Sequence, residues 1–170
     1  SSLIVRALSL YAALSFSARV CVVRGGAERL AALACAAGFH PAVNPDAERG
    51  VGTSVSVGTL AALERRPDLD GVLYAVGDQP YLTRASVERL LDAFTRAPDK
   101  IVSLSYGGER GNPAVFPRAL FTELAALDGD VGGGAVIRRH PKKLLLVEAA
   151  AAEELADVDV RPESEPEQKK

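Results

Sequence analysis

Residues 71–83 read GVLYAVGDQPYLT, and this stretch decides the fold class. A β-prone run ends abruptly in Gly77-Asp78, and Thr83 then offers the N-cap of a helix. The carboxylate of Asp78 is therefore expected at the C-terminal end of a buried strand, the edge at which open α/β sheets bind their ligands. A carboxylate there holds a hydroxyl group or a hard cation such as Mg²⁺. The alternative is that Asp78 only caps the turn that follows it.

On both sides of this stretch, helical and extended patterns alternate along the chain. We expect helices near residues 3–16, 27–37, 54–65, 84–94, 117–127 and 131–140, and extended segments near 19–23, 40–43, 71–76, 101–105, 114–116, 144–147 and 156–160. Such alternation predicts βαβ units, and so an α/β fold around a mostly parallel sheet. We expect one domain over residues 1–160. The tail over residues 161–170 is expected to be flexible, because it is rich in Glu, Pro, Gln and Lys.

The composition excludes several classes of protein. The chain has 170 residues, of which 48% are hydrophobic and 25% are charged, as in ordinary globular proteins. The net charge is −2, so the chain does not have the excess of basic residues that is typical of nucleic-acid-binding proteins. No uncharged apolar stretch reaches membrane-spanning length, so we expect a cytoplasmic protein that binds neither nucleic acid nor membrane. Cys21 and Cys35 lack metal-type spacing, and we interpret both as small buried thiols.

Several short motifs then follow one another in a recognisable order. They are residues 50–56 (GVGTSVS), 77–80 (GDQP), 106–116 (YGGERGNPAVF), 129–132 (GDVG), 139–141 (RHP) and 157–159 (DVD). In this order and spacing, the chain resembles the molybdenum cofactor cytidylyltransferase-like (MobA-like) nucleotidyltransferases over nearly its whole length. The resemblance implies a three-layer, Rossmann-like α/β domain of the nucleotide-diphospho-sugar transferase type.

The resemblance also implies an activity. Enzymes of this kind move a nucleoside monophosphate from an NTP to the phosphate of an acceptor and release pyrophosphate. The group expected here is CMP from CTP, with GMP as the second choice, and the expected acceptor is a phosphorylated pterin of the molybdopterin type. Mg²⁺ is the expected cofactor, and a molybdoenzyme or its chaperone is a candidate protein partner.

Site residues follow from the matching motifs. Asp78 matches the family's Mg²⁺ ligand, and Asp159 matches a second carboxylate on the metal side, with Asp157 as the less favoured choice. Asp130 is the third catalytic candidate and lies on a loop that shapes the acceptor side. Contacts to the nucleotide or the acceptor are expected from Gly52, Thr53, Ser54, Gly77, Pro80 and Asn112.

The chemistry agrees with these residue types. Nucleotidyl transfer is an in-line displacement at phosphorus, so the protein mainly positions the reactants and neutralises charge. Mg²⁺ is usually held by one or two carboxylates together with substrate phosphates. An ionised phosphate needs no general base, so neither His40 nor His140 is expected to be catalytic. Local structure offers alternatives at two positions, since Asp130 also suits a helix cap and Asn112 also suits a turn.

Two departures from the family pattern bear on function. The family's strand and glycine-rich loop, of the form Leu-Ala-Ala-Gly-x-Ser-x-Arg-Met-Gly, do not occur in this sequence, and Ser1 to Ile4 match the segment that follows them. We expect the natural protein to carry that loop before Ser1; the alternative is a truncated, inactive form. Gly134 stands where the family often has Arg, which bears on the identity of the acceptor.

Two other functions remain open at this point. The first is a nucleotide- or cofactor-binding protein that keeps the fold without catalysis. The second is a sugar-nucleotide glycosyltransferase on the same fold, for which a second carboxylate is expected beside the one at the strand end. Because residues 77–79 read Gly-Asp-Gln, the glycosyltransferase ranks last.

Overall fold

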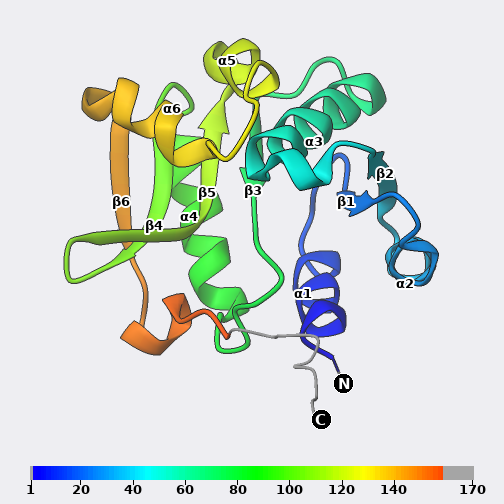
Figure 1. Cartoon of the computed structure of the whole chain (residues 1–170). Helices are drawn as coiled ribbons and strands as arrows, with labels where there is room; N and C mark the ends of the chain where they lie inside the picture. Colours follow the sequence, from blue (N-terminus) through cyan, green and yellow to red (C-terminus); the bar gives the residue numbers. More distant parts are fainter. Residues whose placement is uncertain (1, 159–170) are drawn as a thin grey trace, which may run out of the picture.

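The computed structural model describes residues 2–158, drawn in colour in Figure 1. Its helices and strands are, in chain order, α1 (Leu3–Ala12), β1 (Val20–Arg24), α2 (Glu28–Ala36), β2 (His40–Asn44), α3 (Val51–Arg65), β3 (Gly71–Tyr74), α4 (Arg84–Arg96), β4 (Ile101–Tyr106), β5 (Glu109–Pro117), α5 (Phe121–Ala125), α6 (Gly133–Arg139) and β6 (Leu144–Glu148). The expected tail over residues 161–170 and Asp159 lie outside the described residues. The α/β class predicted from the sequence is confirmed.

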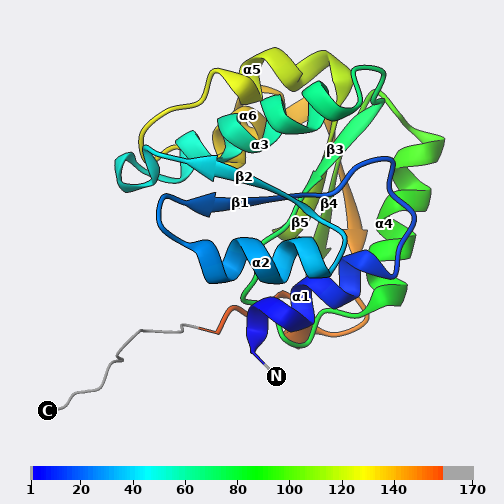
Figure 2. The ribbon, with the colours of Figure 1, turned by 90° about the vertical axis from the view of Figure 1, so that its right-hand side faces the viewer.

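The strands form two sheets, not the single, mostly parallel sheet predicted. β1 and β2 pair in parallel, and the larger sheet has the order β3-β5-β4-β6. In that sheet β5 runs antiparallel to both β3 and β4, whereas β4 and β6 are parallel. The antiparallel pairs arise because Gly107 and Gly108, both at positive φ, turn the chain directly from β4 into β5. β1 and β2 lie to one side of the larger sheet in Figure 1 and in front of it in Figure 2, and they do not pair with β3.

Helix α3 joins the two sheets. It packs against β1, β2 and β3, and it lies between the small and the large sheet in Figure 1. Towards β3, the hydroxyl groups of Thr59 and Tyr74 are hydrogen-bonded. Towards β1, a Cβ on Gly58 would lie 3.1 Å from the side chain of Val22, so the helix approaches the small sheet closely there.

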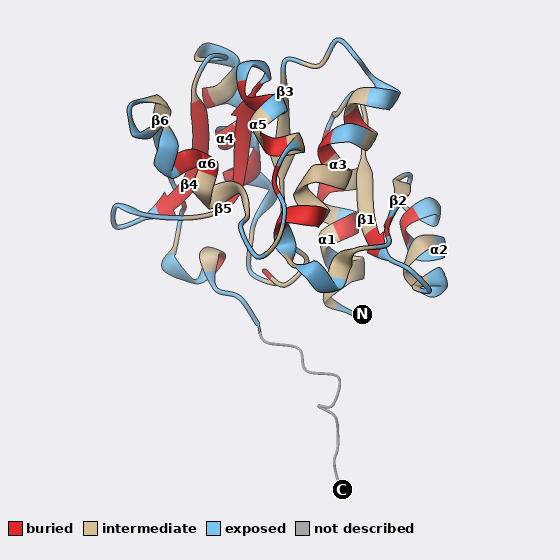
Figure 3. Ribbon diagram, turned by 45° about the horizontal axis from the view of Figure 1, so that its top comes forward, coloured by how far each residue is buried: buried red, intermediate tan, exposed pale blue. Residues whose placement is uncertain are grey.

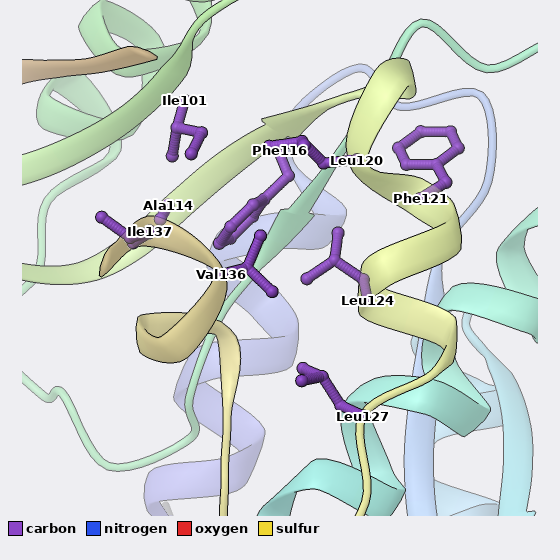
Figure 4. Packing of buried hydrophobic residues seen from close by; sticks show 9 residues of the cluster. All are labelled: Ile101, Ala114, Phe116, Leu120, Phe121, Leu124, Leu127, Val136 and Ile137. Atoms are coloured by element: carbon purple, nitrogen blue, oxygen red, sulfur yellow. The ribbon is translucent and has the colours of Figure 1, made fainter. Parts of the chain in front are cut away.

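The larger sheet is covered by apolar side chains on both faces. Along β5, neighbouring side chains point to opposite faces, so Phe116 packs towards α5 and α6, and Val115 packs towards α4. Figure 4 shows Phe116 beside Val136 of α6, with Leu124 of α5 on the other side of Val136. Burial is concentrated in β4 and β5, as Figure 3 shows, so this sheet is the rigid platform that positions the loops at its ends.

The predictions about the two cysteines and about membrane-spanning segments can be compared with the structure. Cys35 is exposed and Cys21 is partly buried, so the interpretation of both as buried thiols is wrong for Cys35. The reason is that α2 buries only Ala34 among its residues. Within residues 2–158, no helix combines the length and apolar character needed to cross a membrane.

Candidate functional site

Asp78 lies in the loop that follows β3, the position predicted from the sequence. Its Oδ1 atom is buried and has no hydrogen-bond partner among residues 2–158. Burial, and then the negative charge of Asp157, raise the pKa of Asp78 above its ordinary value. A buried carboxylate oxygen without a donor costs folding free energy, so such an atom calls for an explanation. A hard cation is a ligand that would satisfy it.

The segment after β6 returns to this loop. The backbone N–H of Val158 donates to the carbonyl oxygen of Asp78 at 2.9 Å. Figure 1 shows the two segments meeting at the lower end of the molecule, the one green and the other orange to red. This contact brings Asp157 close enough to act on the pKa of Asp78. The structure thus joins Asp157, the less favoured sequence candidate, to Asp78, and the role of Asp159 stays a prediction.

The donor set fits a cation that is completed by a substrate. Within residues 2–158, no group of three or more His, Cys, Asp or Glu side chains gathers to hold a metal ion. Asp78 and Asp157 supply two carboxylates at one sheet edge. Mg²⁺ is typically bound by one or two carboxylates, waters and substrate phosphates, so this pair suffices only when phosphate oxygens complete the site.

Glu154 fixes the segment that carries Asp157. Its side chain is 2% exposed and accepts four hydrogen bonds, at 2.7–3.0 Å, from Thr83 (backbone and hydroxyl), Ser86 and Ala150. Thr83 is the N-cap of α4, as predicted, so Glu154 ties the short 3-10 helix Ala152–Leu155 to the start of α4. Sequence reasoning missed Glu154, because nothing in its alanine-rich surroundings distinguishes it from the exposed Glu153.

Gln79 connects the Asp78 loop to β5. It is 9% exposed, and its Nε2 donates to the backbone carbonyl of Asn112 at 3.0 Å, while its Oε1 is buried without a partner among the described residues. The structure therefore places Asn112 beside the Asp78 loop. Pro80 is partly buried next to Gln79, and a Cβ on Gly77 would lie 3.1 Å from the side chain of Ile4 on α1.

The glycine-serine turn over residues 50–54 opens α3, and the hydroxyl group of its Thr53 is hydrogen-bonded to other residues of the protein. Asn44, only 1% exposed, donates from Nδ2 to Thr53 Oγ1 at 2.9 Å and to Ser54 Oγ at 3.0 Å. Thr53 Oγ1 in turn donates to the carbonyl oxygen of Gly50 at 2.7 Å. The Thr53 hydroxyl therefore shapes the turn, which was not foreseen. Ser54 lines a cavity of about 470 Å³ between the C-terminal end of β1 and the start of α3.

The second glycine-rich loop packs directly on this turn. A Cβ on Gly52 would lie 2.5 Å from the carbonyl oxygen of Val131, and the Gly52 N–H donates to the carbonyl oxygen of Gly129 at 2.9 Å. Only glycine permits this approach of two backbones. Asp130 lies on that loop and is exposed. The N-cap of α6 is Gly132, without a side-chain cap bond, so the alternative of Asp130 as a helix cap is wrong.

Each of the two histidines is hydrogen-bonded to a neighbouring side chain. His140 Nε2 lies 2.7 Å from Glu123 Oε2, and this hydrogen bond, with help from Arg139, holds the pKa of Glu123 below its usual value. His40 Nδ1 lies 3.2 Å from Arg65 Nη1. Neither histidine is hydrogen-bonded to Asp78 or Asp130 in the described part of the chain.

The carboxylate of Asp78 thus follows the carboxyl end of a strand in an α/β fold, the edge at which open α/β sheets bind their ligands. Residues 1–144 match the family of the MobA-like NTP transferase domain, and the chain belongs to this family. The resemblance stated from the motifs is thereby confirmed. A comparison with curated proteins finds no match.

Solved structures agree with this assignment. Rv0371c from Mycobacterium tuberculosis H37Rv is 30% identical, with 92% of this chain and 80% of that chain covered and a TM-score of 0.71. A structure titled as the complex of Rv0371c with manganese is 28% identical, covers 92% and 81% of the two chains, and has a TM-score of 0.69. A nucleotidyl transferase from Methanothermobacter thermautotroptrophicus has the same fold, with a TM-score of 0.70. It is 18% identical, and the match covers 92% of this chain and 73% of that chain.

Proposed function

We propose that this protein is an Mg²⁺-dependent nucleotidyltransferase that moves CMP from CTP to the phosphate of a pterin acceptor of the molybdopterin type. The observation that carries the proposal is that Oδ1 of Asp78, at the strand edge beside Asp157, is buried and has no hydrogen-bond partner among residues 2–158. Membership of the MobA-like family supports the reaction class. The manganese complex of the similar mycobacterial protein supports a divalent cation.

In the proposed reaction, an oxygen of the acceptor phosphate attacks the α-phosphorus of the nucleotide. The bond from that phosphorus to the bridging oxygen of the β-phosphate breaks, and pyrophosphate leaves with the electron pair. The nucleophile is already ionised, so no proton has to be removed. The work of the chain is to align the reactants and neutralise charge.

Asp78 and Asp157 are the residues that would hold the cation, and Asp159 is proposed to join them. A bound Mg²⁺ supplies positive charge that offsets the phosphates and stabilises the leaving pyrophosphate. Gln79 holds the Asp78 loop against Asn112, and Glu154 holds the Asp157 segment against α4. These two residues therefore anchor the two segments to the fold, and neither is proposed to touch the substrate or the cation.

The nucleoside is proposed to lie over the turn that opens α3. Ser54 and Gly50 line the cavity there, together with Arg24 and Val22 of β1. Its volume of about 470 Å³ lies in the range typical of small-molecule sites. Asp130, on the loop packed against this turn, is proposed to face the acceptor. The recipient of the product would be a molybdoenzyme or its chaperone.

Thermal unfolding of the full-length protein tests the proposal. CTP, GTP, ATP and UTP are each added with and without Mg²⁺ to the wild type, to Asp78→Asn and to the control Asp92→Asn, an exposed position on α4. A ligand at a hundred times its Kd stabilises by about 2.7 kcal/mol, or roughly 5–10 °C for a chain of this size. We expect an Mg²⁺-dependent shift with CTP that Asp78→Asn loses and Asp92→Asn keeps.

Two outcomes would overturn the proposal. One is an equal shift in Asp78→Asn and the wild type, which removes the metal assignment. The other is a shift without release of pyrophosphate when a phosphorylated pterin is added, which favours a nucleotide-binding protein without catalysis.

A further inference from the structure

Gly134, in α6, lies under two guanidinium groups. A Cβ on Gly134 would be 3.2 Å from Nη2 of Arg110 and 3.2 Å from Nη1 of Arg138. Arg110 comes from the β5 arm of the hairpin, and Arg138 comes from the last turn of α6. Two positive charges from separate elements therefore meet above one glycine, and the missing side chain gives them the room.

Neither guanidinium has a counter-charge in the structure. Among residues 2–158, Arg110 and Arg138 form no hydrogen bond and no ion pair, whereas the adjacent Arg139 pairs with Glu123 at 3.1 Å. Two like charges at this spacing repel each other, and an anion between them removes the repulsion. The planar fork of a guanidinium matches the oxygens of a phosphate group.

The pair lies at the end of the larger sheet that carries the candidate site. Arg110 is two positions before Asn112 on β5, in the stretch where the pairing of β5 with β4 changes register. The carbonyl of Asn112 accepts from Gln79, the neighbour of Asp78. Arg138 and Gly134 belong to the helix that follows the loop of Asp130. The pair thus stands between the strand-edge carboxylates and the loop proposed to face the acceptor.

We propose that Arg110 and Arg138 together form the subsite that binds the phosphate of the acceptor, a phosphomonoester. This inference rests on the proposed function, and it assigns the acceptor end of the same site. The two guanidiniums grip the oxygens that do not attack and leave one oxygen free towards the α-phosphorus. Gly134 bears on the geometry of this subsite, because a Cβ there would lie within 3.2 Å of both guanidinium tips.

Phenyl phosphate is the probe, and its binding to the full-length protein is followed by the width of its ³¹P signal. The variants are Arg110→Gln, Arg138→Gln and Gly134→Ala, with Arg96→Gln on α4 as a charge-matched, exposed control. We expect the two arginine variants each to weaken phenyl phosphate binding at least about tenfold and Arg96→Gln to leave it unchanged. Gly134→Ala is expected to weaken binding as well, although alanine favours the helix and the net charge stays the same.

The outcomes separate this inference from the proposed function. No broadening with the wild type, equal binding in both arginine variants, or the same loss in Arg96→Gln would each overturn the subsite. The Mg²⁺-nucleotide shift is measured on the same variants. If the wild type shows no such shift but binds phenyl phosphate through the arginine pair, the proposed function fails, and the pair remains only as a site for phosphomonoesters. The reverse result removes the subsite alone.

Discussion

Two carboxylates at the same end of the molecule, Glu154 and Asp78, have opposite environments. Glu154 accepts four hydrogen bonds in a buried position. Burial alone would raise its pKa, but the donors on Thr83, Ser86 and Ala150 outweigh burial and hold the pKa below the ordinary value. Asp78 has a buried oxygen with no donor in the described part of the chain, and burial together with Asp157 raises its pKa.

Under the proposed function, this difference separates a carboxylate that stabilises the fold from one that binds a cation. A buried charge is stable when donors replace its water, as they do around Glu154. Where the donors are missing and a second carboxylate is near, the charge destabilises the fold, and such groups gather at functional sites. On this account Asp78 acts on turnover, and Glu154 acts on stability.

The largest expected effect is on catalysis. Asp78→Asn is expected to lower turnover by roughly a thousandfold, because it removes a carboxylate that would hold the cation at the phosphates. Pyrophosphate release from CTP with a phosphorylated pterin is the measurement, and Asp92→Asn is the control. Turnover of Asp78→Asn within a factor of two of the wild type would contradict the assignment of Asp78 to catalysis and of Glu154 to stability.

The next effect is on stability. Glu154→Ala is expected to lower the free energy of unfolding by about 3 kcal/mol, because the donors around it lose their acceptor in a buried position. The midpoint of thermal unfolding should fall by roughly 6–12 °C. The matched control is Glu153→Ala, an exposed neighbour, which should change stability by less than about 0.5 kcal/mol. Equal effects of the two substitutions would show that Glu154 does not anchor its segment.

A smaller effect of opposite sign is expected for Asp78. Without metal or nucleotide at pH 7, Asp78→Asn should raise the unfolding midpoint by about 2–4 °C, since it removes an unsatisfied charge. The pKa of Asp78 is raised in the folded state, so the charged form destabilises the fold above that pKa. The gain should therefore shrink as the pH is lowered through it. A loss of stability at pH 7 would contradict this.

The smallest effect is the pH dependence due to Glu154. The pKa of Glu154 is lowered in the folded state, so its contribution is complete above the ordinary value of 4.5 and is lost as the pH falls through the folded value. Melting curves of the wild type and Glu154→Gln between pH 7 and pH 3 should converge at the acid end. A gap that stays constant over this range would mean that the charge of Glu154 is not what its donors stabilise.

The sequence predicted the elements of the fold better than their pairing. The cap at Thr83 and the strand before Asp78 were visible because both depend on local residue type. The division into two sheets was not predicted, since it depends on whether β1 and β3 meet. The Gly107-Gly108 turn joins β4 and β5 into a hairpin, and β5 therefore extends well beyond the predicted residues 114–116.

In the candidate site, too, the sequence predicted local features better than tertiary contacts. The position of Asp78 follows from its strand, and its approach to the 157–159 segment was implied only by family resemblance. The anchoring of that segment by Glu154 was not predictable, because a buried and an exposed glutamate look alike in an alanine-rich run. The internal use of the Thr53 hydroxyl by Asn44 and Gly50 depends on a tertiary contact that no local pattern encodes.

The most direct test of the central claim is the binding of Mn²⁺ with CTP, followed by electron paramagnetic resonance. The samples are the full-length wild type, Asp78→Asn and Glu154→Gln, at a temperature at which all three are folded. The account predicts a CTP-dependent bound Mn²⁺ in the wild type and in Glu154→Gln, and its loss in Asp78→Asn. Equal binding in Asp78→Asn and the wild type would contradict it.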